Sequence, residues 1–77
     1  MTKNKYFIEI YIYIGKEVIL SALAGNNLMD LKREIMPTVK KECKKRGYTD
    51  KTVFVEYFID KNEEYFDSDE CFISLAD

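Results

Sequence analysis

The sequence predicts a small α+β domain with the element order ββαββ, in which a four-stranded, mainly antiparallel sheet is covered on one face by one helix. Three observations lead to this prediction. Apolar residues alternate with period two near the N-terminus, an apolar stripe with helical spacing follows, and two further β-favouring segments close the chain. With 77 residues the chain has room for one core, so residues 1–77 are expected to form a single domain.

The first two strands are predicted by the alternation and by the turn that follows it. Tyr6–Ile14 places Ile at every even position from Ile8 to Ile14, with mostly aromatic residues between. Gly15 and Lys16 suit a two-residue type II′ turn, whose first central position needs the positive φ that Gly adopts freely. Residues 18–23 are the expected return strand, antiparallel to the first.

The middle of the chain predicts a helix that begins near Leu28. Asn27 is a suitable N-cap, and Gly47 follows a run of cations that favours the negative end of the helix dipole. Pro37 removes a backbone hydrogen bond, so we expect a kink there or two short helices that meet. Spacings of three and four residues define one apolar stripe, made by Leu28, Leu31, Ile35, Val39 and Cys43.

The C-terminal third predicts two more strands with an acidic segment between them. Residues 52–59 are the expected third strand, residues 60–70 an acidic loop or long hairpin turn, and residues 71–75 a short fourth strand. A hairpin, a helix and then further strands is an order similar to the β-grasp arrangement of ubiquitin-like domains. The similarity is one of topology and carries no functional residues over, and other ββαββ sheets with one covering helix stay equally open.

Charge is distributed unevenly along the chain. The formal net charge is −2, yet residues 62–77 hold six acidic residues and no basic one. A total near neutrality disfavours strong nonspecific attraction to nucleic acid, which needs a clearly basic field. The two cysteines are too few for the disulfide framework of a small secreted domain, so we expect a cytoplasmic protein.

The residue types exclude most familiar catalytic arrangements. The chain has no His, which removes the commonest general base and transition-metal ligand. Cys43 and Cys71 are expected to be small core residues, and the three glycines stand at turns, so no phosphate-binding loop is indicated. Residues 60–71 do not fit the ligand spacing of a calcium loop. We therefore expect no enzyme, no cofactor and no metal.

One sheet face is expected to be left without a covering helix. If the even-numbered Ile residues face the helix, aromatic residues of the first and third strands face away, with Val18 and Leu20 beside Tyr13 and Tyr11. A patch this apolar needs a partner. Homodimerisation is our first choice, a protein target the second and stacked single-stranded bases the third, while the acidic segment could also fold over the patch. The ring residues in question are Tyr11, Tyr13, Phe54 and Phe58.

Together these features predict a small non-enzymatic protein-binding module. The acidic residues proposed to engage a partner are Glu63, Glu64, Asp67, Asp69 and Glu70. In type, though not in any motif, the chain resembles small phage or mobile-element proteins, including anti-CRISPR proteins, that inhibit nucleic-acid-handling proteins by offering carboxylates where phosphates bind. The alternative is a nucleic-acid-binding regulator that uses the basic helix through Lys40, Lys41, Lys44 and Lys45. A small enzyme, or a metal-dependent site, built on the acidic segment is a third hypothesis.

Overall fold

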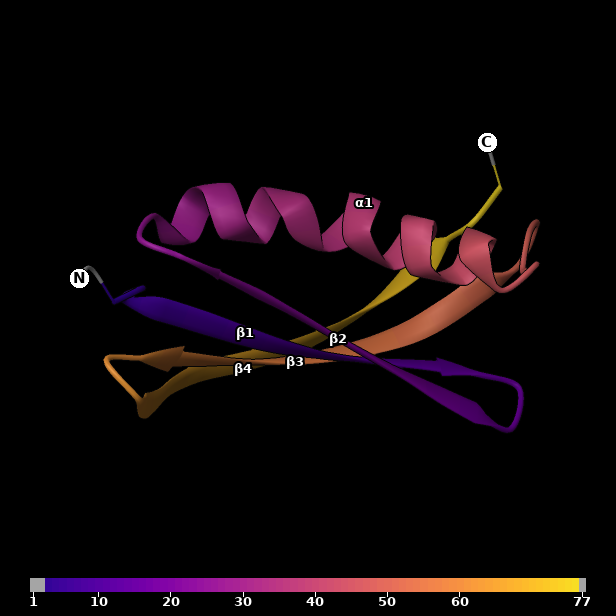
Figure 1. The fold of residues 1–77 in the computed structure, drawn as a ribbon. Coiled ribbons are helices and arrows are strands. Elements are labelled where there is room, and N and C mark those ends of the chain that lie inside the picture. The colour runs from indigo at the N-terminus through magenta and orange to yellow at the C-terminus, as the bar shows by residue number, and fades with distance from the viewer. Residues whose placement is uncertain (1–2, 77) are drawn as a thin grey trace.

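A computed structural model describes residues 3–76 and confirms the predicted fold class. The strands are β1 (Tyr6–Ile14), β2 (Glu17–Gly25), β3 (Thr52–Lys61) and β4 (Glu64–Ser74), and the helix α1 (Leu28–Lys45) follows β2. The four strands form one sheet, with α1 lying across one of its faces (Figure 1). In the described part of the chain, no helix combines the length and apolarity needed to span a membrane.

The β1–β2 hairpin has the predicted turn and register. Gly15 has a φ of 58°, whereas Lys16 is not in the positive-φ region, which is the pattern of signs in a type II′ turn. The turn sets Ile14 opposite Glu17 and thereby fixes every later pair. Leu20 consequently lies beside Tyr11, as predicted, and Val18 lies beside Tyr13.

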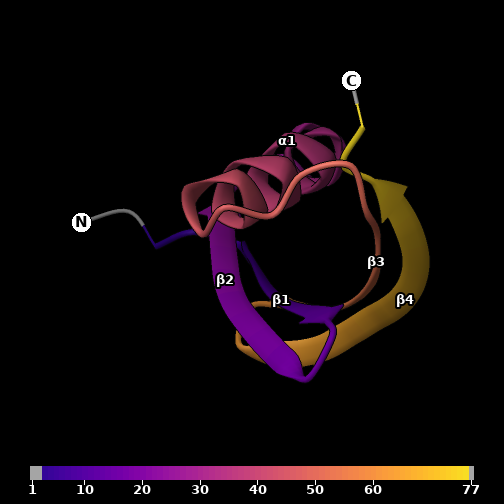
Figure 2. The ribbon, with the colours of Figure 1, turned by 90° about the vertical axis from the view of Figure 1, so that its right-hand side faces the viewer.

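The strand order is β2-β1-β3-β4, and every neighbouring pair is antiparallel. The first strand therefore pairs with the third. In a β-grasp sheet the first strand instead lies parallel to the last, so this chain has one of the other ββαββ arrangements that the sequence left open. The sheet curls into a trough that is open towards α1 (Figure 2), as strongly twisted strands do.

The helix begins at the predicted cap. The Asn27 side chain accepts a hydrogen bond of 3.1 Å from the backbone N–H of Asp30, and the chain leaves the helix through Gly47, whose φ is 85°. The helix runs through Pro37 as one element, so the prediction of two short helices is wrong. Pro37 is exposed, and the tertiary packing of the apolar stripe holds the helix together across the missing hydrogen bond.

The core lies between α1 and the inner face of the sheet, by which we mean the strand residues on the helix side. The alternate residues of β1 and β3 face inward as predicted, and the stripe of α1 packs on them. Among the described residues no polar or charged side chain is buried. The fully buried side chains are Ile8, Ile10, Ile12, Val39, Cys43, Val53, Val55 and Ile59.

The predicted acidic loop is instead part of a long hairpin, and the prediction of a short fourth strand over residues 71–75 is wrong. β3 continues to Lys61, and β4 already starts at Glu64. Asn62 and Glu63 have φ values of 52° and 69°, the two positive values of a type I′ turn. The acidic residues of β4 have low β-propensity, but they form a strand because β3 supplies a regular partner. A bulge in β4, opposite Ile59 and Asp60, accommodates one extra residue.

Candidate interaction surface

The side of the sheet away from α1, here named the outer face, is uncovered in the described part of the chain. β4 is part of the sheet, so the acidic segment does not fold over this face, which excludes the alternative in which it covers the rings. Strand alternation and register place four rows of side chains across it. The rows, from β2 to β4, are Val18–Tyr13–Phe54–Phe72, Leu20–Tyr11–Glu56–Glu70, Ala22–Glu9–Phe58–Ser68 and Ala24–Phe7–Asp60–Tyr65.

Aromatic rings form the apolar part of the outer face. The rings of Tyr13 and Phe54 lie 5.8 Å apart, those of Phe54 and Phe72 5.2 Å apart, and those of Tyr11 and Phe58 5.5 Å apart at an interplanar angle of 86°. Phe72 is 73% exposed and Phe58 38% exposed. The four ring residues predicted to face a partner are thus brought together, and Phe72 extends the group.

Carboxylates are the second component of the outer face. Its register positions include Glu9, Glu56, Asp60 and Glu70, and Glu56 lies directly opposite Glu70 across the β3–β4 pair. Lys61 is the one basic residue in the four strands, and it lies in the register of the inner face, with its amine over the Phe66 ring. The outer-face strand positions therefore combine rings with negative charge and contain no Lys or Arg.

Two of the carboxylates raise the pKa of neighbouring phenols. The Tyr11 hydroxyl donates to Glu9 Oε2 at 3.2 Å, and this hydrogen bond raises the pKa of Tyr11 above its usual value. Hydrogen bonding to Glu56 likewise raises the pKa of Tyr13. Both phenols are neutral at physiological pH, so they add hydrogen-bonding capacity and ring surface without adding charge.

A shallow hollow of about 290 Å³ lies where β3 and β4 adjoin on this side. It is lined by Glu56, Phe58, Ser68 and Glu70, which lie in the outer-face register, and by Asp69, which lies in the inner-face register. Carboxylates bind a guanidinium through charge-assisted hydrogen bonds, and an aromatic face attracts the same group. The hollow therefore has the chemistry that suits an arginine side chain.

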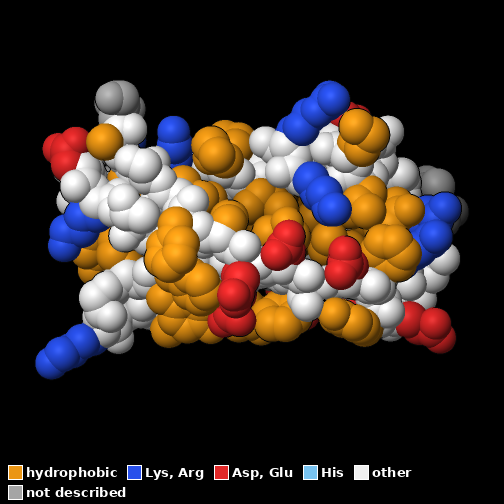
Figure 3. Space-filling model, turned by 180° about the vertical axis from the view of Figure 1, so that it is seen from behind, with side chains coloured by type: hydrophobic (Ala, Val, Ile, Leu, Met, Phe, Trp, Pro, Cys, Tyr) orange, Lys and Arg blue, Asp and Glu red, His pale blue; other side chains and the backbone are white. Residues whose placement is uncertain are grey.

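The five acidic residues predicted to engage a partner lie in different parts of the β3–β4 hairpin. Glu63 lies in the β3–β4 turn, where its carboxylate pairs with the Lys3 amine, and Glu64 is opposite Lys61. Asp67 and Asp69 lie in the register of the inner face, so only Glu70 shares the outer face with the rings. Acidic side chains set among hydrophobic ones are visible on the β4 side of the molecule, with cationic side chains above them (Figure 3).

Strand alternation predicts that Glu9 and Glu56 lie on the same face as the rings, and the structure confirms it, although neither is among the residues predicted to engage a partner. Asp60 was placed in a loop, and its outward position became visible only with the extension of β3.

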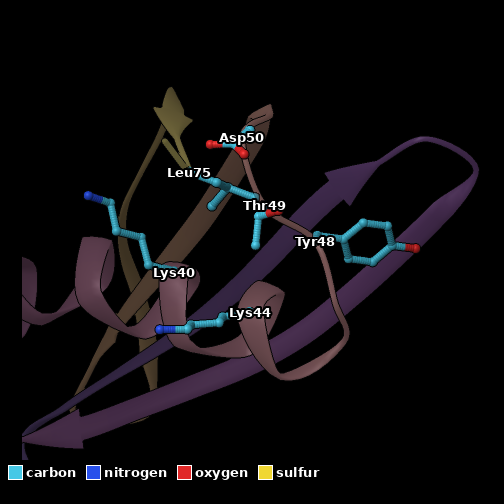
Figure 4. Close-up of a pocket in the computed structure, with 6 residues that line it drawn as sticks. All are labelled: Lys40, Lys44, Tyr48, Thr49, Asp50 and Leu75. Carbon is cyan, nitrogen blue, oxygen red and sulfur yellow. The ribbon is translucent and has the colours of Figure 1, made fainter. Parts of the chain in front are cut away.

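The basic residues of the alternative hypothesis lie on the exposed sides of α1 near its C-terminus. Lys40 and Lys44 line a hollow of about 300 Å³ with Asp50, which brings a carboxylate into any anion site there. The Tyr48 ring points away from the two lysines (Figure 4). The Lys45 amine lies 3.5 Å from Glu42 Oε2, so part of the positive charge is compensated within the helix. Lys41 is exposed on the same helix.

The two cysteines differ in their environments. Cys43 is fully buried on the helix stripe, as predicted, and burial raises the pKa of its thiol. Cys71 was predicted to be a core residue, and this is wrong, because its side chain is exposed. α1 lies closer to β2 and β1 than to β4, which leaves a hollow of about 210 Å³ beside Cys71, lined also by Met36.

The described residues offer little enclosure for chemistry. Within residues 3–76 no three His, Cys, Asp or Glu side chains gather as a metal site would require. The comparison of the chain with models of protein families, with curated proteins and with solved structures finds no match. The surface just described is therefore the feature of the chain that bears on its function.

Proposed function

We propose that this chain is a non-enzymatic protein-binding module of the cytoplasm that docks its outer face on a basic surface of a nucleic-acid-handling protein and inhibits it. One observation carries the proposal. The outer face presents exposed aromatic rings together with four carboxylates, and its strand positions hold no compensating cation. Rings of this kind form the energetic centre of many protein interfaces, and the surrounding charges select the partner.

The sign of the charge argues for a foreign partner at this face. If two copies met through their outer faces, the four carboxylates of one copy would approach those of the other, with Glu56 and Glu70 near the middle rows. Like charges brought together in a partly desolvated contact cost several kcal/mol, by the usual order of magnitude. With a basic partner this cost is absent, and the same carboxylates contribute attraction.

The same charges disfavour nucleic acid at the outer face. Base stacking on the rings would bring phosphates close to Glu9 and Glu56, which repel them. Surfaces dense in Lys and Arg are characteristic of proteins that bind nucleic acid. A carboxylate-bearing face that occupies such a surface keeps phosphates away from it, which is a direct route to inhibition.

A first experiment uses a defined basic probe, the peptide octa-arginine. Titration of the peptide into the isotopically labelled chain should shift the backbone amide signals of β3 and β4 around Glu56, Phe58 and Glu70 in NMR spectra. The variant Glu56→Gln/Glu70→Gln should weaken binding about tenfold or more. The matched control Asp30→Asn/Glu34→Gln removes the same charge from the exposed side of α1 and should bind as the parent chain does.

A second measurement tests the inhibitory mode. The chain should release a short labelled DNA duplex from its complex with octa-arginine, and the release should fail for Glu56→Gln/Glu70→Gln. The effect should fade at high salt, because exposed charges are screened over about 8 Å at physiological ionic strength and over less when salt is added.

Two results would overturn the proposal. The first is a set of peptide-induced shifts that lies away from the outer face, or a loss of affinity in the control variant as large as that in Glu56→Gln/Glu70→Gln. The second is direct binding of the DNA duplex to the chain, with shifts at Lys40, Lys41 and Lys44 of α1. That result would favour the nucleic-acid-binding regulator instead.

A further inference from the structure

The sheet has two open edges, and they differ in chemistry. β2 and β4 are the outermost strands, so each leaves backbone N–H and C=O groups without a partner strand among residues 3–76. Open edges attract other strands, and proteins commonly block them with charges and bulges. β4 has both devices, namely the bulge opposite Ile59 and Asp60 and the charges of Asp67, Asp69 and Glu70.

The edge of β2 has neither device. From Val18 to Gly25 the strand contains no charged residue and no proline, and its pairing with β1 is regular from one end to the other. In Figure 1 this edge faces the viewer below α1, with β2 in front of the other strands. An uncharged edge of eight residues is unusual for a protein that remains alone.

The turn geometry identifies which groups of β2 point outward. In a two-residue turn the residues on either side of it, here Ile14 and Glu17, are joined by the backbone hydrogen bond of the turn. Hydrogen-bonded pairs then alternate along the hairpin. The N–H and C=O groups that point away from β1 consequently belong to Val18, Leu20, Ala22 and Ala24.

The side chains of these four residues are complementary to a copy of themselves. Two large residues, Val18 and Leu20, stand at one end of the edge, and two small ones, Ala22 and Ala24, stand at the other. An antiparallel copy centred on Ser21 would set Val18 against the second copy's Ala24, and Leu20 against its Ala22. Each contact would then pair a large side chain with a small one. Leu20 is 64% exposed and Val18 52% exposed in the single chain.

We propose that two copies of this chain pair through β2, antiparallel and related by a twofold axis at Ser21, to form one continuous eight-stranded sheet. Each of the four outward residues pairs with a residue of the second copy and exchanges two hydrogen bonds with it. A twofold interface must be compatible with itself. The uncharged β2 edge meets this condition, whereas the acidic β4 edge would repel its own copy.

This pairing is independent of the proposed function. The contact is made by backbone groups and by the four outward side chains of β2, so the rings and carboxylates of β1, β3 and β4 stay free. The two outer faces would lie side by side in the joined sheet and present the partner surface twice. The variant Glu56→Gln/Glu70→Gln should therefore still form the dimer, even though it binds octa-arginine more weakly.

Sedimentation velocity across a dilution series tests the proposal. At the upper concentrations, the mass derived from the sedimentation of the parent chain should be twice its 9.1 kDa. Ala22→Lys and Ala22→Glu should each raise the dissociation constant about tenfold or more, because like charges would become diagonal neighbours across the twofold axis. An equimolar mixture of the two variants should recover the dimer. The control Ser74→Lys, on the exposed β4 edge, should leave the dimer unchanged.

Amide hydrogen exchange distinguishes the β2 edge from any other contact. In the dimer the amides of Leu20 and Ala22 should be protected, and Ala22→Lys should remove that protection while the amides of β1 keep theirs. A parent chain that stays at the single-chain mass at every concentration would overturn the proposal. So would a dimer in which the Leu20 and Ala22 amides exchange freely.

Discussion

Replacing Glu70 by Lys is expected to raise the free energy of unfolding although it removes part of the proposed partner surface. Glu70 and Glu56 face each other across β3 and β4, and like charges directly opposite in a sheet are destabilising. The substitution converts this pair into an attractive one at an exposed position of β4, where a longer side chain has room.

The size of the effect follows from the pair geometry. Cross-strand pairs of opposite charge contribute about 0.2–1 kcal/mol, so the change from repulsion to attraction should be worth about 0.5–1 kcal/mol at low salt. For a domain of this size that corresponds to a rise in melting temperature of about 2–8 °C. Glu70 is exposed, so the gain should shrink in 1 M NaCl, where the screening length is about 3 Å.

Urea unfolding and thermal melting, both followed by circular dichroism, measure the change. The matched control is Glu64→Lys, which places a second cation opposite Lys61 and should lower stability by a similar amount. The parent chain, Glu70→Lys and Glu64→Lys should unfold with the same dependence on urea concentration.

The reasoning is refuted if Glu70→Lys is no more stable than the parent chain at low salt while Glu64→Lys behaves as expected. In that case Glu56 and Glu70 do not oppose each other strongly enough for their pairing to have a cost. An increase in stability that is unaffected by salt would show that packing, and not charge, is responsible.

Three further predictions concern the helix and the cysteines. Ellman's reagent should label Cys71 in the native protein and Cys43 only after unfolding, because Cys43 is fully buried; equal labelling rates would contradict this. Pro37→Ala should raise the free energy of unfolding by about 1–3 kcal/mol in urea, since the helix regains a hydrogen bond, and an unchanged midpoint would show that the proline is accommodated without cost. The Arg46 guanidinium, 3.3 Å from Glu42, lowers the pKa of that carboxyl. The contribution of this pair to the free energy of unfolding is therefore fully present above the ordinary Glu value of 4.5 and is lost as pH falls through the lower native pKa. Glu42→Gln should therefore reduce stability by about 0.3–0.5 kcal/mol at pH 7 and leave it unchanged in strong acid, as pH-dependent melting would show.

Local rules were sufficient for most of the elements. Period-two alternation in β1 and β3 determined which residues face α1, and the turn at Gly15 fixed the register that sets Leu20 beside Tyr11. Asn27 marked the start of the helix because its side chain satisfies a backbone N–H of the first turn. These features depend on residues close together in the sequence, so they can be derived without the rest of the fold.

The candidate surface was only partly accessible to the same rules. The rings of Tyr11, Tyr13, Phe54 and Phe58 were placed on one face by alternation alone, and the structure agrees. The acidic residues from Glu63 to Glu70 were treated as one loop surface, whereas the structure divides them between a turn, the inner face and the outer face. Charge counted along the chain does not specify the face on which each carboxylate lies.

What the sequence by itself determined is therefore the set of elements up to Ile59 and the sidedness of the sheet. The tertiary structure decided the rest. Pairing with β3 extends β4 to Glu64 against the low β-propensity of its acidic residues, and the position of α1 over β2 and β1 leaves Cys71 exposed. The adjacency of β1 and β3 is a contact between distant segments, and no local pattern encodes it. Such contacts are selected by the total burial that the whole sheet and helix achieve together, which is a property of the folded molecule and not of any one segment.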